Sequence, residues 1–305
     1  MTDCTPVHTI RDGVYAASLT PLRGDLSIDH AAYAKHAHWL LQHGCDGLAV
    51  MGTTGEATSF SIAERQEALE RLLIEGLPPA RLMVGTGCAA LPDTIALTRH
   101  ARANGVNAVL TLPPFYYKSP SDDGLFAAFD QLIQAVGDTR LKVYLYHFPQ
   151  MSAVPFSNAL IERLLTAYPD TIAGMKDSSG DVHHMLEVIA QFPRLRLFAG
   201  TEQYLVDVLR AGGAGCISAT INITCRLTQK LYRQWSGGGT FMLQQQITGI
   251  RRTVETLPVI PALKCVMAQL TKQTAWQHVR PPHVPLNRAG TEFLQKITQQ
   301  VAQSL

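Results

Sequence analysis

Short apolar runs alternate with longer amphipathic segments over most of the chain. Each run is apolar at nearly every position and ends at a Gly, Pro or other turn residue, which is typical of parallel strands buried on both faces. Strands are predicted at residues 14–19, 46–51, 82–85, 108–112, 141–146, 172–176, 195–199 and 215–219.

The segments between the runs have the length and caps of crossover helices. Ser61 and Glu64 have capping-box spacing, and Asp93 and Ser157 are predicted as further N-caps. Helices are predicted at residues 29–43, 61–75, 93–104, 157–168 and 203–210.

A series of eight strand–helix units over about 220 residues matches a (β/α)₈ TIM barrel of the α/β class. A doubly wound open sheet is the alternative architecture. Its first turn is usually rich in glycine, whereas the first turn here is Thr20-Pro21-Leu22-Arg23. The sequence therefore favours the barrel.

The pattern changes after Asn222, where only helices are predicted, at residues 227–235, 240–257, 262–273 and 291–303. A glycine-rich break at 236–239 and a proline-rich loop at 281–285 separate some of them. We expect a barrel at residues 1–222 and a C-terminal helical region at residues 223–305.

The composition is that of a globular protein, with 46% hydrophobic and 16% charged residues. A net charge of +2 without a dense basic run argues against nucleic-acid binding. The six cysteines form no CxxC pair and are expected to be reduced thiols. No apolar run could span a bilayer and the N-terminus lacks a signal-peptide core, so a cytoplasmic location without membrane contact is expected.

Active sites of this fold lie at the carboxyl ends of the strands. Of the eight lysines, only Lys176 ends a predicted strand, whereas Lys142 begins one. A buried, neutral lysine can attack a ketone and form an imine. The alternative is a structural ion pair with Asp177 or Asp181. The position at a strand end favours the imine.

Other strand ends carry further candidates. Tyr146 ends the fifth strand, where its phenol could relay protons. Gly52, Thr53 and Thr54 follow the second strand, where hydroxyls and amides could hold a carboxylate. The lesser candidates are Gly200-Thr201-Glu202, after the seventh strand, and Gly215-Cys216-Ile217-Ser218, on the eighth. Each of these residues could instead be part of an ordinary turn or a half-buried core.

No His, Asp and Glu cluster with ligand spacing is recognised at the strand ends, so neither a metal nor a cofactor is expected. The neighbouring His183 and His184 follow the sixth strand and would face different sides of a helix. They are predicted to be surface residues.

Four motifs in this order resemble the dihydrodipicolinate synthase/N-acetylneuraminate lyase family: GTTGE at 52–56, PPFYY at 113–117, YHFP at 146–149 and GMKDSSGD at 174–181. The resemblance runs from about Gly13 into the tail. It implies a TIM barrel with C-terminal helices, a homotetramer built as a dimer of dimers, and pyruvate or a pyruvoyl group bound as an imine on Lys176.

The resemblance also implies roles for single residues. Tyr146 matches the catalytic tyrosine, while Thr53 and Thr54 would hold the pyruvoyl carboxylate, with Thr53 linked to Tyr146 in a proton relay. Ile217 matches a position near the pyruvate methyl group. Gly52, Ser178 and Gly200 match the substrate-binding loops.

One further position implies contact between subunits. Tyr116 matches a tyrosine that many members contribute to a neighbouring subunit's site. The doubled Tyr116-Tyr117 leaves the register open by one residue.

Two departures from the family pattern narrow the activity. Met151 stands where the lysine-biosynthetic synthases have an arginine for the carboxylate of the aldehyde partner, and a thioether cannot make that contact. His147 replaces the usual asparagine, and the sequence does not indicate what it contacts.

The leading hypothesis is a pyruvate-dependent class I aldolase or lyase for a 2-oxo acid, such as a 2-keto-3-deoxy sugar acid or 4-hydroxy-2-oxoglutarate. The alternatives are a dehydratase that uses the same imine, a 4-hydroxy-tetrahydrodipicolinate synthase, and a non-catalytic 2-oxo-acid-binding protein.

Overall fold

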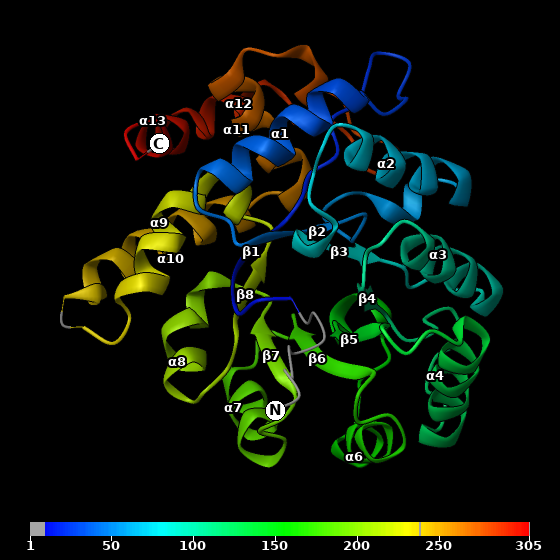
Figure 1. Cartoon of the computed structure of the whole chain (residues 1–305). Coiled ribbons are helices and arrows are strands. Elements are labelled where there is room, and N and C mark those ends of the chain that lie inside the picture. The colour runs from blue at the N-terminus through cyan, green and yellow to red at the C-terminus, as the bar shows by residue number, and fades with distance from the viewer. Residues whose placement is uncertain (1–9, 238, 305) are drawn as a thin grey trace, which may run out of the picture.

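Eight parallel strands close into a barrel in chain order, with β8 pairing back to β1 (Figure 1). The computed structural model describes residues 10–237 and 239–304. The strands are β1 Gly13–Ala17, β2 Gly47–Val50, β3 Leu82–Gly85, β4 Ala108–Thr111, β5 Lys142–His147, β6 Ile172–Asp177, β7 Arg196–Ala199 and β8 Gly215–Ser218. The predicted barrel is confirmed, and each predicted strand differs from the observed one by at most two residues at either end.

Helices cover the outside of the barrel, one after nearly every strand. They are α1 His30–Gln42, α2 Ile62–Ile74, α3 Leu91–Ala103, α4 Asp122–Val136, α5 Pro149–Ser152, α6 Asn158–Ala167, α7 Val182–Gln191, α8 Leu205–Arg210 and α9 Ile221–Gln234. The capping box of Ser61 with Glu64 and the Ser157 cap are confirmed. The Asp93 cap is wrong, because α3 begins at Leu91 after Ala90, with Pro92 in its first turn.

The C-terminal part adds four helices that lie beside α1 and α9 (Figure 1). They are α10 Thr240–Glu255, α11 Val259–Thr271, α12 Arg288–Phe293 and α13 Gln295–Ala302. The single helix predicted at 291–303 is instead two helices that meet at Leu294, whose side chain is buried against α11. Helix α9 begins six residues before its predicted start and crosses residue 222.

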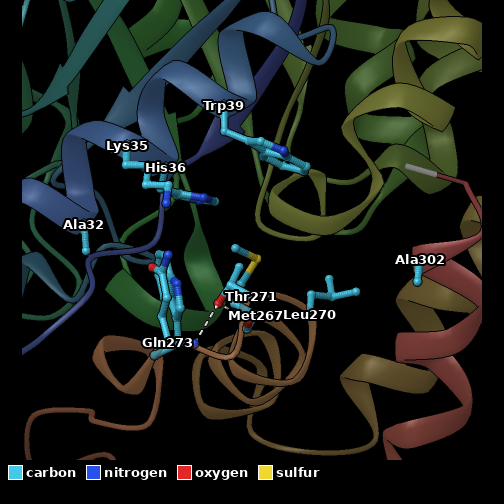
Figure 2. Close-up of a pocket in the computed structure, with 10 residues that line it drawn as sticks. Ala32, Lys35, His36, Trp39, Met267, Leu270, Thr271, Gln273 and Ala302 are labelled. Carbon is cyan, nitrogen blue, oxygen red and sulfur yellow. Dashed lines mark hydrogen bonds between the residues drawn. The ribbon is translucent and has the colours of Figure 1, made fainter.

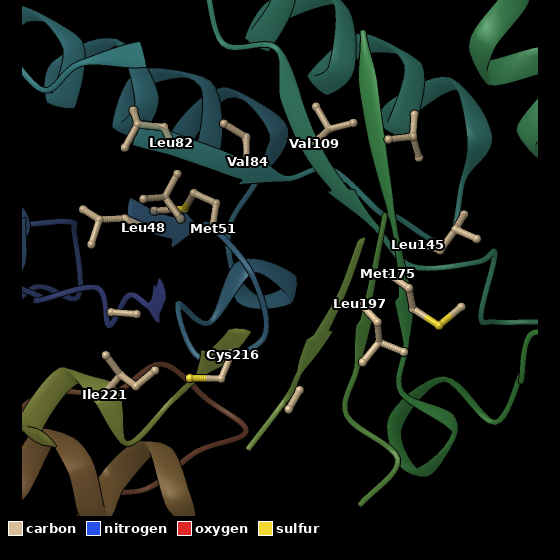
Figure 3. Packing of buried hydrophobic residues seen from close by; sticks show 14 of the residues in the cluster. Leu48, Met51, Leu82, Val84, Val109, Leu145, Met175, Leu197, Cys216 and Ile221 are labelled. Carbon is tan, nitrogen blue, oxygen red and sulfur yellow. The ribbon is translucent and has the colours of Figure 1, made fainter. Parts of the chain in front are cut away.

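Two apolar layers hold the barrel together. The larger one lies between strands and helices and includes Leu48 of β2, Val109 of β4 and Leu197 of β7 (Figure 3). The smaller one fills the barrel interior, where the ring of Phe198 lies 5.6 Å from that of Tyr15 and 6.1 Å from that of Tyr144. Since these aromatic rings fill the interior, a ligand can enter only at an end of the barrel.

No helix within the described residues is both long and apolar enough to cross a membrane. The five described cysteines form no disulfide, and Cys4 lies outside the described residues.

Candidate active site

Lys176 and Tyr146 lie side by side at the carboxyl ends of β6 and β5. The two residues are register partners in the paired strands, so their side chains point to the same face, into the barrel. Lys176 Nζ donates to Tyr146 Oη at 3.2 Å and lies 4.4 Å from the centroid of the tyrosine ring. Lys176 is only 5% exposed. The lysine amine and the phenol are therefore buried next to each other.

The ion pair considered as the alternative role of Lys176 does not form. Asp177 accepts hydrogen bonds from His184 Nδ1 at 2.6 Å and from the Ser179 N–H at 2.8 Å. Asp181 caps helix α7. Among the described residues, no carboxylate pairs with Lys176, which leaves its amine facing the barrel mouth.

The turn after β2 brings Thr53 to the same place. Thr53 Oγ1 lies 3.3 Å from Tyr146 Oη, so a hydrogen-bonded chain runs from Thr53 through Tyr146 to Lys176. A chain of this kind can pass a proton between the amine and the threonine hydroxyl by way of the phenol. The predicted link between Thr53 and Tyr146 thus has the distances that a relay requires.

This threonine turn is anchored by a residue that sequence reasoning overlooked. Glu56 is buried at the end of the turn, in a left-handed conformation with φ 59°, and pairs with Lys264 of α11. Its other carboxylate oxygen accepts the Arg280 N–H at 2.8 Å. Burial lowers the pKa of Lys264 from its usual value, and Glu56 partly offsets this. The sequence identified Lys264 only as a helical lysine, because a contact between positions 56 and 264 has no local signature.

A cavity of about 600 Å³ opens above Lys176. A volume of this order accommodates a small organic acid with room to spare. Six of the predicted site residues line it: Thr53, Thr54, Tyr146, Lys176, Ser178 and Gly200. Met151 also lines the cavity from α5 and is 64% exposed.

Three predicted residues lie elsewhere. Gly52 lines a smaller adjoining cavity together with Thr53 and Tyr146. Ile217 is fully buried in the barrel interior, in the same apolar cluster as Tyr146. Tyr116 is 72% exposed on the loop after β4, outside the lining of the cavity, and Tyr117 beside it is 78% exposed. Within one copy of the chain, the structure does not bring Tyr116 to Lys176.

Another part of the cavity wall carries charged residues that were not predicted. Arg251 and Glu255 of α10 line it and form an ion pair at 2.8 Å. Behind them, Glu202 is fully buried and accepts from Arg251 at 3.1 Å, from Ser218 at 2.5 Å and from Thr220 at 2.6 Å. Residues on a helix outside the barrel cannot be recognised by a search of strand ends.

A polar cluster lies on the outer side of the same two strands. His147, Asp177 and His184 place one potential ligand atom each within 4.8 Å of one another. The prediction that the strand ends hold no cluster of potential metal ligands is therefore wrong. The cluster was missed because His147 and Asp177 are far apart in sequence and become neighbours only through strand pairing. His183 is exposed as predicted, but His184 is half-buried against Asp177.

The geometry of this cluster suits hydrogen bonding better than chelation. The two imidazole rings are stacked, with centroids 4.5 Å apart and an interplanar angle of 16°. Lone pairs in the planes of stacked rings do not converge on one ion. Nδ1 of His147 accepts the Phe156 N–H at 3.2 Å, which answers what this histidine contacts.

The titration of the three groups follows from these contacts. Burial lowers the pKa of His147, whereas the hydrogen bond to Asp177 raises the pKa of His184. Burial alone would raise the pKa of Asp177, but its hydrogen bonds to His184 and Ser179 outweigh burial and lower it. These shifts favour the charged forms of Asp177 and His184 and the neutral form of the His147 ring that is stacked on His184.

A second cavity, of about 320 Å³, lies outside the barrel between α1 and the C-terminal helices (Figure 2). Its walls include Trp39, Met267 and Leu270, and none of the predicted site residues lines it. His36 at its edge bonds to Asn222 at 2.8 Å, and burial lowers the pKa of this histidine to about 4. His36 is therefore a neutral core histidine.

Comparisons with known proteins agree with this geometry. Residues 11–301 match the model of the Dihydrodipicolinate synthetase family. The chain is 34% identical over 292 residues to an uncharacterized DapA-like lyase from Chloroflexus aurantiacus, which covers 95% of this chain and 96% of that protein.

Two crystal structures show the same fold. The dihydrodipicolinate synthase from Agrobacterium tumefaciens is 29% identical with a TM-score of 0.86, over 96% of this chain and 98% of that one. YagE from E. coli K12, a prophage protein of the dihydrodipicolinic acid synthase family solved in complex with pyruvate, is 25% identical with a TM-score of 0.87, over 96% and 99%. The chain therefore belongs to the Dihydrodipicolinate synthetase family and, like other members, is a lyase.

Proposed function

We propose that this protein is a class I aldolase or lyase that binds pyruvate, or the pyruvoyl end of a 2-oxo acid, as an imine on Lys176. The observation that carries the proposal is the chain of contacts from Thr53 through Tyr146 to Lys176 in the wall of the cavity. The relative YagE was crystallised with pyruvate, which supports a pyruvoyl group as the ligand.

The chemistry follows from the groups present. The Lys176 amine attacks the ketone carbon, and the resulting carbinolamine loses water to give a protonated imine. Cleavage of the bond between C3 and C4 sends its electron pair into the imine and leaves an enamine, while the C4 hydroxyl loses its proton and becomes an aldehyde. Tyr146 is placed to exchange protons with the carbinolamine and the C4 hydroxyl, with Thr53 behind it. Protonation of the enamine and hydrolysis then release pyruvate.

We further propose that Thr53 and Thr54, with the backbone of their turn, hold the pyruvoyl carboxylate. Both line the cavity beside Tyr146. Their rigid attachment through Glu56 and Lys264 favours this role, since a preorganised donor loses little entropy on binding. Gly52, Ser178, Gly200 and Ile217 complete the proposed pyruvoyl site.

Met151 supports a lyase or aldolase of another 2-oxo acid over a 4-hydroxy-tetrahydrodipicolinate synthase. It lines the cavity with a thioether where a synthase needs a guanidinium for the carboxylate of its aldehyde substrate. Loss of such a charge-assisted contact costs about 2–4 kcal/mol. Dehydration from the same imine is the second candidate. Free pyruvate plus an aldehyde as products would indicate aldol cleavage, and water loss without C–C cleavage would indicate dehydration.

We also propose a homotetramer in the cytoplasm. Tyr116 and Tyr117 are exposed, and the loop that carries them is tied by Lys118, which donates to the Phe115 carbonyl at 2.5 Å and to the Ser152 carbonyl at 3.2 Å. An exposed aromatic pair suits an interface between subunits, where one of the two could reach a neighbouring site. The unpaired cysteines suit a reducing compartment.

The test is borohydride trapping with pyruvate, followed by peptide mass mapping. We expect one adduct, on Lys176, and none in Lys176→Ala. The matched control is Lys230→Ala, because Lys230 is exposed on α9 and does not line the cavity. An adduct on another lysine, or no adduct, would overturn the proposal. An adduct without turnover of any 2-oxo acid would favour the non-catalytic alternative.

A further inference from the structure

One wall of the cavity is built around one guanidinium and two carboxylates. Nη2 of Arg251 contacts Glu255 at 2.8 Å, and its Nη1 contacts Glu202 at 3.1 Å and Ser218 at 2.7 Å. The Arg251 side chain is 13% exposed, and Glu255 is 36% exposed at the cavity surface. Glu202 is fully buried behind them.

The charges of this wall do not suit a second carboxylate on the substrate. Two carboxylates surround a single guanidinium, so the wall carries an excess of negative charge before any substrate binds. Of the described residues that line the cavity, Lys176, Arg251 and Glu255 carry formal charges and His283 is the other titratable one, and the charge of the protonated imine on Lys176 lies beside the pyruvoyl carboxylate. A second carboxylate could reach Arg251 only by displacing Glu255.

A hydroxyl group fits the same wall without displacing anything. It can donate to Glu255 and accept from Arg251 at once, since a hydroxyl has one donor and two acceptor sites. The neutral polar side chains of Ser178, Gln150 and Gln203 lie around the same cavity, and Gln203 also donates to Glu255 at 3.4 Å. These groups recognise hydroxyls by hydrogen bonding.

We infer that Arg251 and Glu255 form the specificity-determining pair of the active site, which selects a 2-oxo acid whose distal end is neutral and hydroxylated. This inference rests on the proposed function and deepens it: the aldehyde half is a hydroxyaldehyde, and 2-oxo diacids are rejected. Glu255 rejects the diacid by charge and accepts a hydroxyl proton, while Arg251 orients Glu255 and donates to the hydroxyl oxygen.

The experiment compares two aldehydes as partners for pyruvate in the synthetic direction. Glyceraldehyde and tartronate semialdehyde differ only in carrying CH₂OH or a carboxylate at the distal carbon. We expect wild-type kcat/KM to favour glyceraldehyde, and Glu255→Gln to lower that preference about tenfold or more, the effect of losing one charged hydrogen-bond acceptor and its repulsion of a carboxylate. Arg251→Lys should lower kcat/KM for glyceraldehyde, because an ammonium cannot hold Glu255 and Glu202 together.

The matched control is Glu292→Gln, which removes the carboxylate of another Arg–Glu pair, with Arg288, on the exposed helix α12. It should leave the preference unchanged. Thermal denaturation of each variant reports whether it folds. Glu255→Gln is expected to fold, because glutamine has nearly the same shape as glutamate and the side chain is partly exposed.

Borohydride trapping with pyruvate alone separates this inference from the proposed function. Unchanged trapping in Glu255→Gln with a changed preference supports the inference. Three outcomes overturn the inference alone, provided that pyruvate is trapped normally. The wild-type protein could prefer tartronate semialdehyde, the preference could be unchanged in Glu255→Gln, or neither aldehyde could be turned over. Failure of the wild-type protein to trap pyruvate overturns the proposed function, and the inference with it.

Discussion

The two ends of the active-site cavity are built in different ways. At the inner end, Lys176 lies at the carboxyl end of β6, Tyr146 lies at the carboxyl end of β5, and Thr53 lies in the turn after β2. At the outer end, Arg251 and Glu255 come from α10, which lies outside the barrel. The inner end thus depends mainly on barrel closure, with Lys264 of α11 supporting the threonine turn through Glu56, whereas the outer end depends on how the C-terminal helices dock. In the proposed function, the inner end carries the chemistry that family members share. Substrate selection can then vary through the outer end without disturbing the barrel.

The largest effect tests the inner end. Lys176→Ala should abolish turnover, since no other described lysine lines the cavity and the imine cannot form. Pyruvate release from a panel of 2-oxo acids is the measurement. Residual activity near that of the wild type would remove Lys176 from the mechanism.

Tyr146→Phe should lower kcat by about 10²–10⁴-fold, the usual cost of losing a general acid–base group. The ring of Tyr146 stacks on that of Phe148, with the two centroids 5.7 Å apart, and the variant loses only the hydroxyl, so the fold should be retained. Steady-state kinetics and thermal denaturation together check this. A small loss of activity would mean that another group carries the proton.

The separation between the two ends is tested by Lys264, because this residue of α11 reaches across to the threonine turn. Lys264→Met should destabilise the protein by about 3–5 kcal/mol, since it leaves the Glu56 carboxylate buried without its partner. Urea denaturation measures the loss. The double variant with Glu56→Gln should recover part of it, and an equal loss in both variants would contradict the pairing.

Thr53→Val should lower kcat by roughly 10- to 100-fold, because the Tyr146 hydroxyl loses its hydrogen-bond partner at 3.3 Å while the side-chain volume is kept. If the effect fell on KM alone, Thr53 would serve binding rather than the relay.

The smallest effect concerns the polar cluster behind the inner end. The pKa of His184 is raised in the folded protein, so its contribution to stability is present below the unfolded value near 6.5 and is lost as the pH rises through the folded pKa. The pKa of Asp177 is lowered in the folded protein. Its contribution to stability is therefore present above the ordinary aspartate pKa near 4 and is lost as the pH falls through the lower pKa of the folded state.

His184→Asn should therefore cost about 1–2 kcal/mol at pH 5.5 and less at pH 9. Urea denaturation at the two pH values measures this difference. The exposed neighbour gives the control, His183→Asn, which should show no such difference. An equal cost at both pH values would contradict an ion pair.

The degree to which the sequence predicted each part follows from the range of the interactions involved. Each strand was predicted nearly to its ends because an apolar run of four to six residues between turn residues is a local signal. The helix at 291–303 and the Asp93 cap were wrong because Leu294 docking on α11 and the backbone before Pro92 override local preference. Lys264, Arg251 and the His147–Asp177–His184 cluster were missed because each depends on a contact between residues distant in sequence: Lys264 with Glu56, Arg251 with Glu202, and His147 with Asp177.

By itself, the sequence determined the order of strands and helices, the closed barrel and the position of Lys176 at a strand's carboxyl end, because periodicity and turn residues act over a few neighbours. Only the tertiary structure decided that Tyr146 and Thr53 come within hydrogen-bond distance of one another and of that lysine, and that α10 brings a carboxylate-rich wall to face them. The reason is that such distances depend on strand register and helix docking, which are set by the packing of the whole core.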